Sequence, residues 1–253
     1  MRALILSAAG SLLHLAFAVL AVLIAHRLRG DGGTRAVAWR LTAWVFALYA
    51  LDDVSQLAFA TVAYVLGPES PIFTAYLWWA PIANHSRTFV VWSLYLGLAG
   101  LALSRPSARP HLVRGFPIVV LAMLVGGGMI GWSEGSFDAA RHLSATAVLD
   151  TVGFVGLSGV LFLTMIRGTI DRALWFALVA YGSASVISSL FLAAMAWAGV
   201  AGAWTPPVYA MELVRLTFGS AMVALASWRL RLAWQGLPLA GLLGEEPRRP
   251  VLT

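Results

Sequence analysis

Residues 3–25 read ALILSAAGSLLHLAFAVLAVLIA, a run that contains no charged residue. About 20 predominantly apolar residues are enough for a helix to cross the hydrocarbon core of a bilayer, which is about 30 Å thick. The run ends at the basic residues His26, Arg27 and Arg29, and a glycine-rich turn follows. A single arginine, Arg2, precedes it, and the run is long enough to span. We therefore interpret it as a retained membrane helix and not as a cleaved signal peptide.

The rest of the 253-residue chain repeats this pattern. Hydrophobic residues make up 60% of the sequence and charged residues 11%, less than half of the roughly 25% that is usual in soluble domains. We predict an all-α integral membrane protein whose residues 1–234 form a seven-helix transmembrane bundle. A Gly- and Pro-rich flexible tail over 235–253 follows the bundle. The six further spans lie at about 38–66, 71–105, 113–132, 142–166, 173–200 and 208–233.

The distribution of arginine predicts the orientation. All 17 Lys and Arg residues are arginines, and basic residues of short loops stay on the cytoplasmic side. One set of alternate loops holds two arginines, Arg2 and Arg141, and the other set holds thirteen. This difference predicts an outside N-terminus and a cytoplasmic C-terminus. We expect a multi-pass protein of the cell membrane, in particular of a bacterial inner membrane. The positive charge therefore gives no reason to expect nucleic acid as a partner. The other set holds Arg27, Arg29, Arg35, Arg40, Arg105, Arg109, Arg114, Arg167, Arg172, Arg229, Arg231, Arg248 and Arg249.

Two absences exclude several chemistries. Without lysine there is no ε-amine for a retinal or pyridoxal Schiff base, a P-loop or a lysine nucleophile. Without cysteine there are no disulfides, thiolate nucleophiles or thiolate metal sites. We predict no cofactor.

Six charged residues fall inside the predicted spans: Asp52, Asp53, Arg87, Asp150, Glu212 and Arg215. A charge at the bilayer centre costs about 2.5–3.5 kcal/mol or more. A rise of about 1.5 Å per residue places all six in one layer of the outer half. His14, Gln56, Asn84 and His85 lie at about the same height. We predict that this layer binds a small ligand or an ion in a cavity lined by spans two, three, five and seven. The candidate residues are Asp52, Asp53, Gln56, Asn84, His85, Arg87, Asp150, Glu212 and Arg215.

Helical spacing suggests how these groups pair. Asp52 and Gln56 share a helix face, whereas Asp53 points about 100° away. Glu212 and Arg215 can pair within one helix. We expect Asp52, Arg87, Glu212 and Arg215 to contact the ligand. We expect Asp53, His85 and Asp150 to tune the protonation of the site. Four acids face two guanidinium groups, so one or two acids are expected to hold a proton unless a histidine or cation compensates. The alternative is that these charges are ion pairs that fix helix register.

Motifs for catalysis are weak. Residues 156–159 match the GxSG pattern of intramembrane serine proteases, but no histidine follows on a later span, so close packing of helices is the preferred interpretation. No two histidines share a metal-binding spacing, and we predict no metal site. A cation between Asp52 or Asp53, His85 and Glu212 is a weaker alternative, and a haem between His14 and His85 is weaker still. An enzyme is the least favoured class.

The predicted topology is similar to that of rhodopsins, heptahelical receptors and the seven-helix sensor regions of bacterial signalling proteins. The retinal lysine is missing from span seven, so the similarity concerns topology alone. Three hypotheses follow: a receptor-like or sensory protein with a polar site in the outer half, a proton- or ion-coupled transporter or channel, and a non-catalytic subunit of a larger complex. Their respective partners are a small ligand, an ion and another membrane protein, all within the lipid bilayer.

Overall fold

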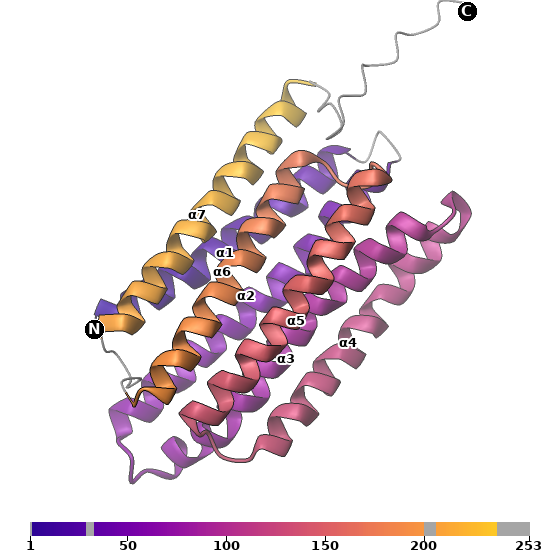
Figure 1. Cartoon of the computed structure of the whole chain (residues 1–253). Coiled ribbons are helices and arrows are strands. Elements are labelled where there is room, and N and C mark those ends of the chain that lie inside the picture. The colour runs from indigo at the N-terminus through magenta and orange to yellow at the C-terminus, as the bar shows by residue number, and fades with distance from the viewer. Residues whose placement is uncertain (1, 29–32, 200–205, 237–253) are drawn as a thin grey trace, which may run out of the picture.

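The computed structural model describes residues 2–28, 33–199 and 206–236, and these form an all-helical bundle (Figure 1). Seven of the described helices are long and apolar enough to cross a membrane, as the sequence predicts. The predicted tail falls outside the described residues from position 237 onward. The helices are α1 (Arg2–Arg27), α2 (Thr34–Leu66), α3 (Pro71–Leu103), α4 (Arg109–Glu134), α5 (Ala139–Ile166), α6 (Arg172–Trp197) and α7 (Pro206–Trp234), with a short 3-10 helix, η2 (Pro106–Ala108), before α4.

The helix ends follow from local chemistry. Ser70 and Asp138 stand immediately before α3 and α5, and their side chains accept the backbone N–H of the residue three positions on, which satisfies a donor that the helix leaves free. Gly67 and Gly135 end α2 and α4 at φ of 85° and 81°, a conformation that favours glycine. These short turns make consecutive helices antiparallel.

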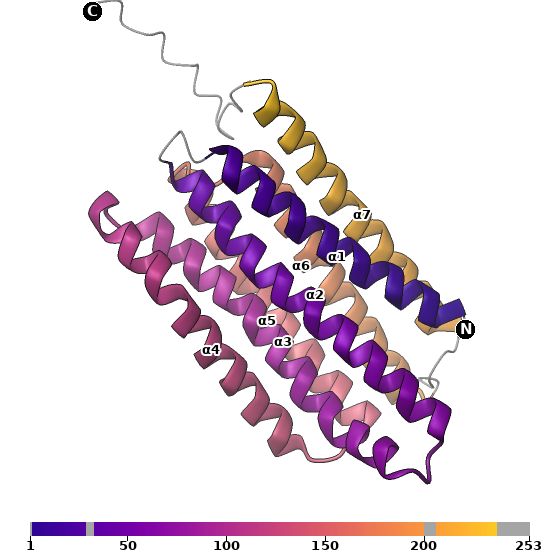
Figure 2. The ribbon, with the colours of Figure 1, turned by 180° about the vertical axis from the view of Figure 1, so that it is seen from behind.

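Six of the helices close into a ring. Going around it, α1 packs on α2, α2 on α3, α3 on α5, α5 on α6, α6 on α7 and α7 on α1. Helix α4 lies outside this ring, mainly against α3, and Figures 1 and 2 show it at the edge of the bundle. We call the end where α1 begins the Arg-poor end and the opposite end, where α1 finishes, the Arg-rich end.

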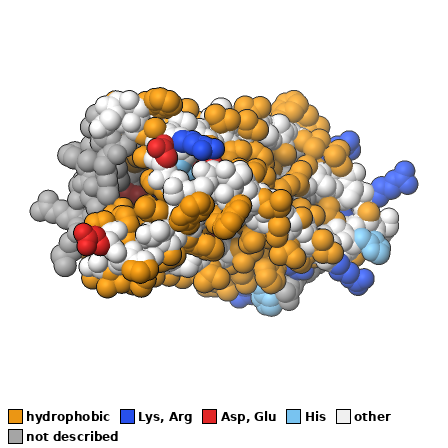
Figure 3. Space-filling model, turned by 90° about the horizontal axis from the view of Figure 1, so that it is seen from below, with side chains coloured by type: hydrophobic (Ala, Val, Ile, Leu, Met, Phe, Trp, Pro, Cys, Tyr) orange, Lys and Arg blue, Asp and Glu red, His pale blue; other side chains and the backbone are white. Residues whose placement is uncertain are grey.

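The outer surface suits a lipid environment. Large apolar side chains such as Val65, Ile118 and Trp197 are more than two-thirds exposed, and a soluble monomer rarely exposes so continuous an apolar surface. Figure 3 shows apolar side chains over most of one face, with basic side chains gathered mainly toward the Arg-rich end. The bundle therefore has the surface of a multi-pass membrane protein.

The two halves of the ring differ in packing. In α2 the buried residues lie between Ala36 and Ala50, apart from Ala63 near the end of the helix, and no residue from Leu51 to Val62 is buried. The packed half is built on large side chains that are almost fully buried, including Phe17, Trp39 and Phe46. The loosely packed stretch of α2 carries the two aspartates. The ring is thus solid toward the Arg-rich end and hollow toward the Arg-poor end.

One buried ion pair near the Arg-rich end corrects the sequence analysis. Arg229 was expected among the loop arginines, but it lies within α7 and is 3% exposed. Its Nε donates to Asp171 Oδ2 at 2.7 Å, and Trp39 Nε1 donates to the same oxygen at 2.9 Å. Asp171 also accepts from Leu174 N at the start of α6. A turn residue and two distant helices are therefore joined by one carboxylate.

Candidate functional site

The main cavity occupies the Arg-poor half of the ring. Its volume is about 530 Å³, within the range of about 300–1,000 Å³ that is usual for small-molecule sites. Polar and aromatic side chains of α1, α2, α3 and α7 line it, and its wall reaches Tyr64 and Val65 in the last turn of α2. The lining residues with polar side chains are Ser7, Ser11, His14, Tyr49, Asp53, Gln56, Thr61, Tyr64, Tyr76, Asn84, Arg87, Glu212 and Arg215.

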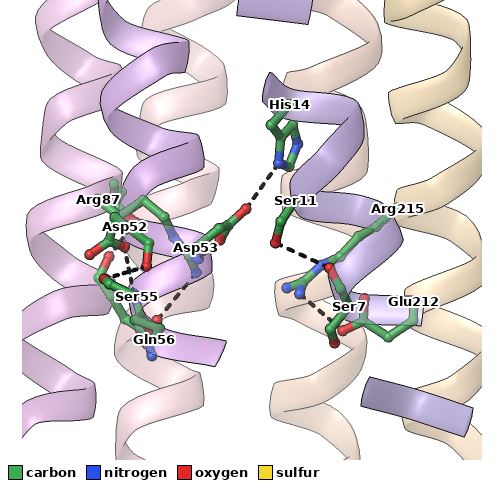
Figure 4. A network of polar contacts seen from close by, with 12 residues as sticks. Ser7, Ser11, His14, Asp52, Asp53, Ser55, Gln56, Arg87, Glu212 and Arg215 are labelled. Carbon is green, nitrogen blue, oxygen red and sulfur yellow. Dashed lines mark hydrogen bonds and ion pairs between the residues drawn. The ribbon is translucent and has the colours of Figure 1, made fainter. Parts of the chain in front are cut away.

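An ion pair between α2 and α3 lies in the wall of this cavity. Arg87 Nη1 donates to Asp53 Oδ1, and the other oxygen of Asp53 lies 3.0 Å from His14 Nδ1 on α1. Figure 4 shows Asp53 and His14 pointing toward one another from the two helices. The Arg87 guanidinium also donates to Asn84 Oδ1 at 3.2 Å and lies 5.1 Å from the centre of the Tyr49 ring. Arg87 and Asp53 are therefore held firmly in place by partners on three helices.

A second pair lies on α7 and is much looser. Arg215 Nη1 donates to Glu212 Oε1 at 3.4 Å, one turn away on the same helix. The Arg215 side chain is 43% exposed, whereas that of Glu212 is 13% exposed. In Figure 4 both lie beside Ser7 and Ser11 of α1. Among the described residues, this is the one hydrogen bond of the Arg215 guanidinium, which has five N–H donors.

The two adjacent aspartates differ from the roles that the sequence analysis assigned. Asp53, expected to tune protonation, is the acid that lines the cavity and pairs with Arg87. Asp52, expected to contact the ligand, is absent from the cavity lining and accepts from Gln56 Nε2 at 2.6 Å on its own helix. The 100° offset between them is the one predicted. Which acid faces inward depends on how α2 is rotated by packing.

Two smaller cavities continue the main one toward the middle of the bundle. The second, about 70 Å³, shares His14, Arg87 and Arg215 with the main cavity and adds Asp150 of α5 and Ser185 of α6. The third, about 10 Å³, shares Asp150 with the second and is also lined by Trp92 and Tyr95 of α3. Helix α5 was expected to line the main cavity, but it borders only these deeper spaces among the three cavities.

Aromatic rings form the floor between the cavities and the packed half. The His14 ring lies 4.7 Å from that of Tyr49, and Tyr181 lies 5.8 Å from Tyr49 and 5.1 Å from Phe46. Phe46 in turn contacts Phe17, which is fully buried. Edge-to-face contact is a preferred arrangement of packed aromatic rings.

The remaining predicted residue, His85, lies in a different cluster. It points away from the cavity and is fully buried, and its Nε2 lies 2.6 Å from Glu134 Oε1 at the end of α4. The other oxygen of Glu134 lies 2.8 Å from His142 Nδ1 on α5. Asn84 Nδ2 lies 3.0 Å from the second ring nitrogen of His142. We call His85, Glu134 and His142 the histidine–glutamate cluster.

The cluster was not found from the sequence. Glu134 and His142 flank the short turn between α4 and α5, and no spacing in the sequence connects them to His85. Helix α3 extends beyond that turn, so His85 meets them although it is far from either end of its own helix. The sequence did contain a signal for this cluster. Glu134 and His142 flank one turn, and His85 lies inside a neighbouring span.

The glycine-rich stretches have mixed roles. A Cβ on Gly127 or Gly131 would lie about 2.5 Å or less from backbone atoms of α3, so glycine permits the close approach of α4. Gly156 and Gly159, expected to pack against a neighbour, meet no described atom within 4 Å. Ser158 between them donates to its own backbone at Phe154 O. This stretch therefore shows no nucleophile–base pair among the described residues.

Comparisons with models of protein families, with curated proteins and with solved structures find no match to this chain. Its function is therefore inferred from the cavity and the side chains around it.

Proposed function

We propose that the protein is a receptor-like or sensory membrane protein that binds a small organic carboxylate in the main cavity. The observation that carries the proposal is Arg215, which reaches into a cavity of about 530 Å³ and is 43% exposed, with one hydrogen bond of 3.4 Å. A guanidinium with free donors in a partly enclosed site is suited to bidentate binding of a carboxylate.

The other charges support this choice. Arg87 donates to Asp53 and Asn84, so its guanidinium is held in the wall of the cavity by partners of the protein itself. Asp53 is already paired with Arg87 and His14. The Glu212–Arg215 contact is long and partly exposed, and such pairs contribute little to stability. Arg215 can therefore bind a ligand carboxylate through its remaining N–H donors and keep Glu212 as a partner.

The packing at the opposite end favours binding over transport. The cavities end at the aromatic floor, and the half beyond it is filled by buried side chains of the core. A transporter would need a second arrangement of the helices that opens this half. The buried pair of Asp171 and Arg229 and the packed core oppose such a rearrangement. Transport is therefore the second candidate, and the receptor-like function is the first.

In this proposal the main cavity opens to the outside of a cell membrane, and we expect that membrane to be a bacterial inner membrane. The chain has no cysteine, so single cysteines test this directly. Ser136, in the turn before α5, and Ser107, in the turn before α4, are both exposed and lie at opposite ends. We expect a membrane-impermeant maleimide to label Ser136→Cys in intact cells and Ser107→Cys only after permeabilisation. The reverse pattern would overturn the orientation.

The ligand class is tested with a thermal-shift panel on the purified protein in detergent. The panel contains small mono- and dicarboxylates and amino acids, with matched amides and amines. We expect at least one carboxylate to raise the melting temperature in a concentration-dependent way, because a ligand that binds only the folded state stabilises it. The shift should disappear in Arg215→Gln, which removes the charge and the bidentate geometry.

The matched control is Arg231→Gln, on the same helix but exposed near the Arg-rich end. It should keep the full shift of the wild type. An equal loss in both variants would point to a general charge effect, and stabilisation by the amides as strongly as by the carboxylates would contradict the proposed ligand class.

A further inference from the structure

The histidine–glutamate cluster is separate from the main cavity. Its three side chains come from α3, α4 and α5, and one potential ligand atom from each lies within 4.8 Å of the other two. Two imidazoles and a carboxylate are donors that zinc and similar transition metals favour, and the same set of three occurs in zinc sites that leave a fourth position open. We propose that this cluster binds a divalent transition metal ion of the zinc type.

Burial and charge support a cation at this place. His85 and His142 are 0% and 2% exposed, and Glu134 is 10% exposed. No arginine among the described residues forms an ion pair with Glu134. A buried carboxylate needs a compensating charge or full hydrogen bonding, because its desolvation is costly. A divalent ion supplies that charge to all three groups at once. His85 Nδ1 is buried without a hydrogen-bond partner among the described residues, so half of this ring is unused.

The backbone holds the three ligands in place. Gly127 and Gly131 bring α4 against α3, and this fixes Glu134 at the next turn of α4. Phe137 N donates to Leu77 O at 2.8 Å, which ties the turn between α4 and α5 to α3. The Phe137 ring lies 5.2 Å from that of His142 and covers it. The site is therefore built from three helices and one fixed turn.

The distances need a small adjustment when a metal enters. Two ligand atoms bound at about 2.1 Å in tetrahedral geometry are about 3.4 Å apart, whereas the glutamate oxygens lie 2.6 Å and 2.8 Å from the imidazole nitrogens. The glutamate oxygens must thus move away from the imidazole nitrogens by less than about 1 Å. The imidazole nitrogens, which lie within 4.8 Å of each other, must come to about the same 3.4 Å, in exchange for protons that the metal displaces. Rotation of the Glu134 side chain at the end of its helix can supply this movement.

Asn84 can form a hydrogen bond with His142 when His142 binds the metal. A metal on His142 Nδ1 leaves a proton on Nε2, which then needs an acceptor. Asn84 lies 3.0 Å from Nε2 and provides that acceptor when its amide turns over to present Oδ1. This rotation of the Asn84 amide breaks the hydrogen bond that Arg87 Nη2 donates to Oδ1. Metal binding is thereby linked to the wall of the main cavity.

The test begins with protein purified in detergent, treated with a chelator and dialysed. Zinc is then added, and the metal that stays bound after gel filtration is quantified by inductively coupled plasma mass spectrometry. We expect one Zn²⁺ per chain in the wild type and a loss of affinity of at least tenfold in Glu134→Gln and His142→Gln. Asn84→Leu should lose about 10–100-fold, the range for an outer partner. His26→Gln and His111→Gln lie outside both the cluster and the main cavity and should bind as the wild type does.

A second measurement uses the wild type alone and so does not depend on how well the variants fold. Cobalt(II) added to the metal-free protein should develop the intense visible absorption of a four- or five-coordinate site, and zinc should abolish it. Absence of this spectrum together with less than one tenth of a zinc ion per chain would overturn the proposal. Unchanged binding in a folded Glu134→Gln protein would overturn it as well. Neither result bears on carboxylate binding at Arg215.

Discussion

Replacing Asp171 with alanine is expected to lower the free energy of unfolding by about 3–5 kcal/mol, the cost of removing one partner of a buried ion pair. Asp171 is 1% exposed and accepts from Arg229, Trp39 and the backbone N–H of Leu174. Its loss leaves the Arg229 guanidinium buried without a counter-charge. The buried Nη1 of that arginine already has no hydrogen-bond partner among the described residues, so no other group is at hand to replace the carboxylate.

The matched control for this prediction is Asp138→Ala. Asp138 also precedes a helix and accepts a backbone N–H, from Arg141 at 2.8 Å, but it is exposed and pairs with no arginine side chain among the described residues. Its removal should cost about 1 kcal/mol, the usual value of a helix cap. Unfolding in mixed micelles with rising SDS measures both. An Asp171→Ala protein that is no less stable than Asp138→Ala would show that the buried pair contributes nothing beyond the cap.

The second large effect is expected at Arg87. Arg87→Leu should lower the free energy of unfolding by about 3 kcal/mol, because it leaves the Asp53 carboxyl without its guanidinium partner in a wall that is largely screened from water. The side chains of the pair are 20% and 14% exposed, so the effect belongs at the lower end of the range for buried pairs. Removing both charges in Asp53→Leu/Arg87→Leu should recover most of the loss, since apolar replacements of buried pairs are often neutral.

The control here is Arg215→Leu, which breaks the exposed pair on α7. Its expected cost is below about 1 kcal/mol. This contrast separates the two arginines that the cavity contains: Arg87 holds the wall, and Arg215 remains free for a ligand. A double variant no more stable than Arg87→Leu, or an Arg215→Leu protein as unstable as Arg87→Leu, would contradict this division.

The helices themselves were accessible from the sequence. Each of the seven runs is longer than a bilayer requires, and each ends at charges, Pro or Gly, so their number and approximate bounds follow from length and composition. Two helices begin four residues earlier than predicted, at Thr34 in α2 and Arg109 in α4, and α3 begins at Pro71 as predicted. Basic residues that were assigned to loops are accommodated in first turns near the Arg-rich end.

The site was accessible in part. Counting residues along each helix put Asp53, Arg87, Glu212 and Arg215 at one height, and the structure brings them to one cavity. The rotation of each helix was not accessible, because all faces of these spans are similarly apolar. This explains the exchange of Asp52 and Asp53. Residues at helix ends were harder still: Glu134, the last residue of α4, is largely screened from water because α3 extends past the turn that follows it.

The central claim is that a small carboxylate occupies the main cavity beside Arg215. Its most direct test is a single cysteine at Ser11, which is 6% exposed and lies in the cavity wall, in a chain that has no other cysteine. We predict that the carboxylate selected by thermal shift slows alkylation of Ser11→Cys in proportion to its occupancy, and leaves the rate at Ser107→Cys unchanged. Alkylation of Ser11→Cys at the same rate with and without saturating carboxylate would contradict the claim.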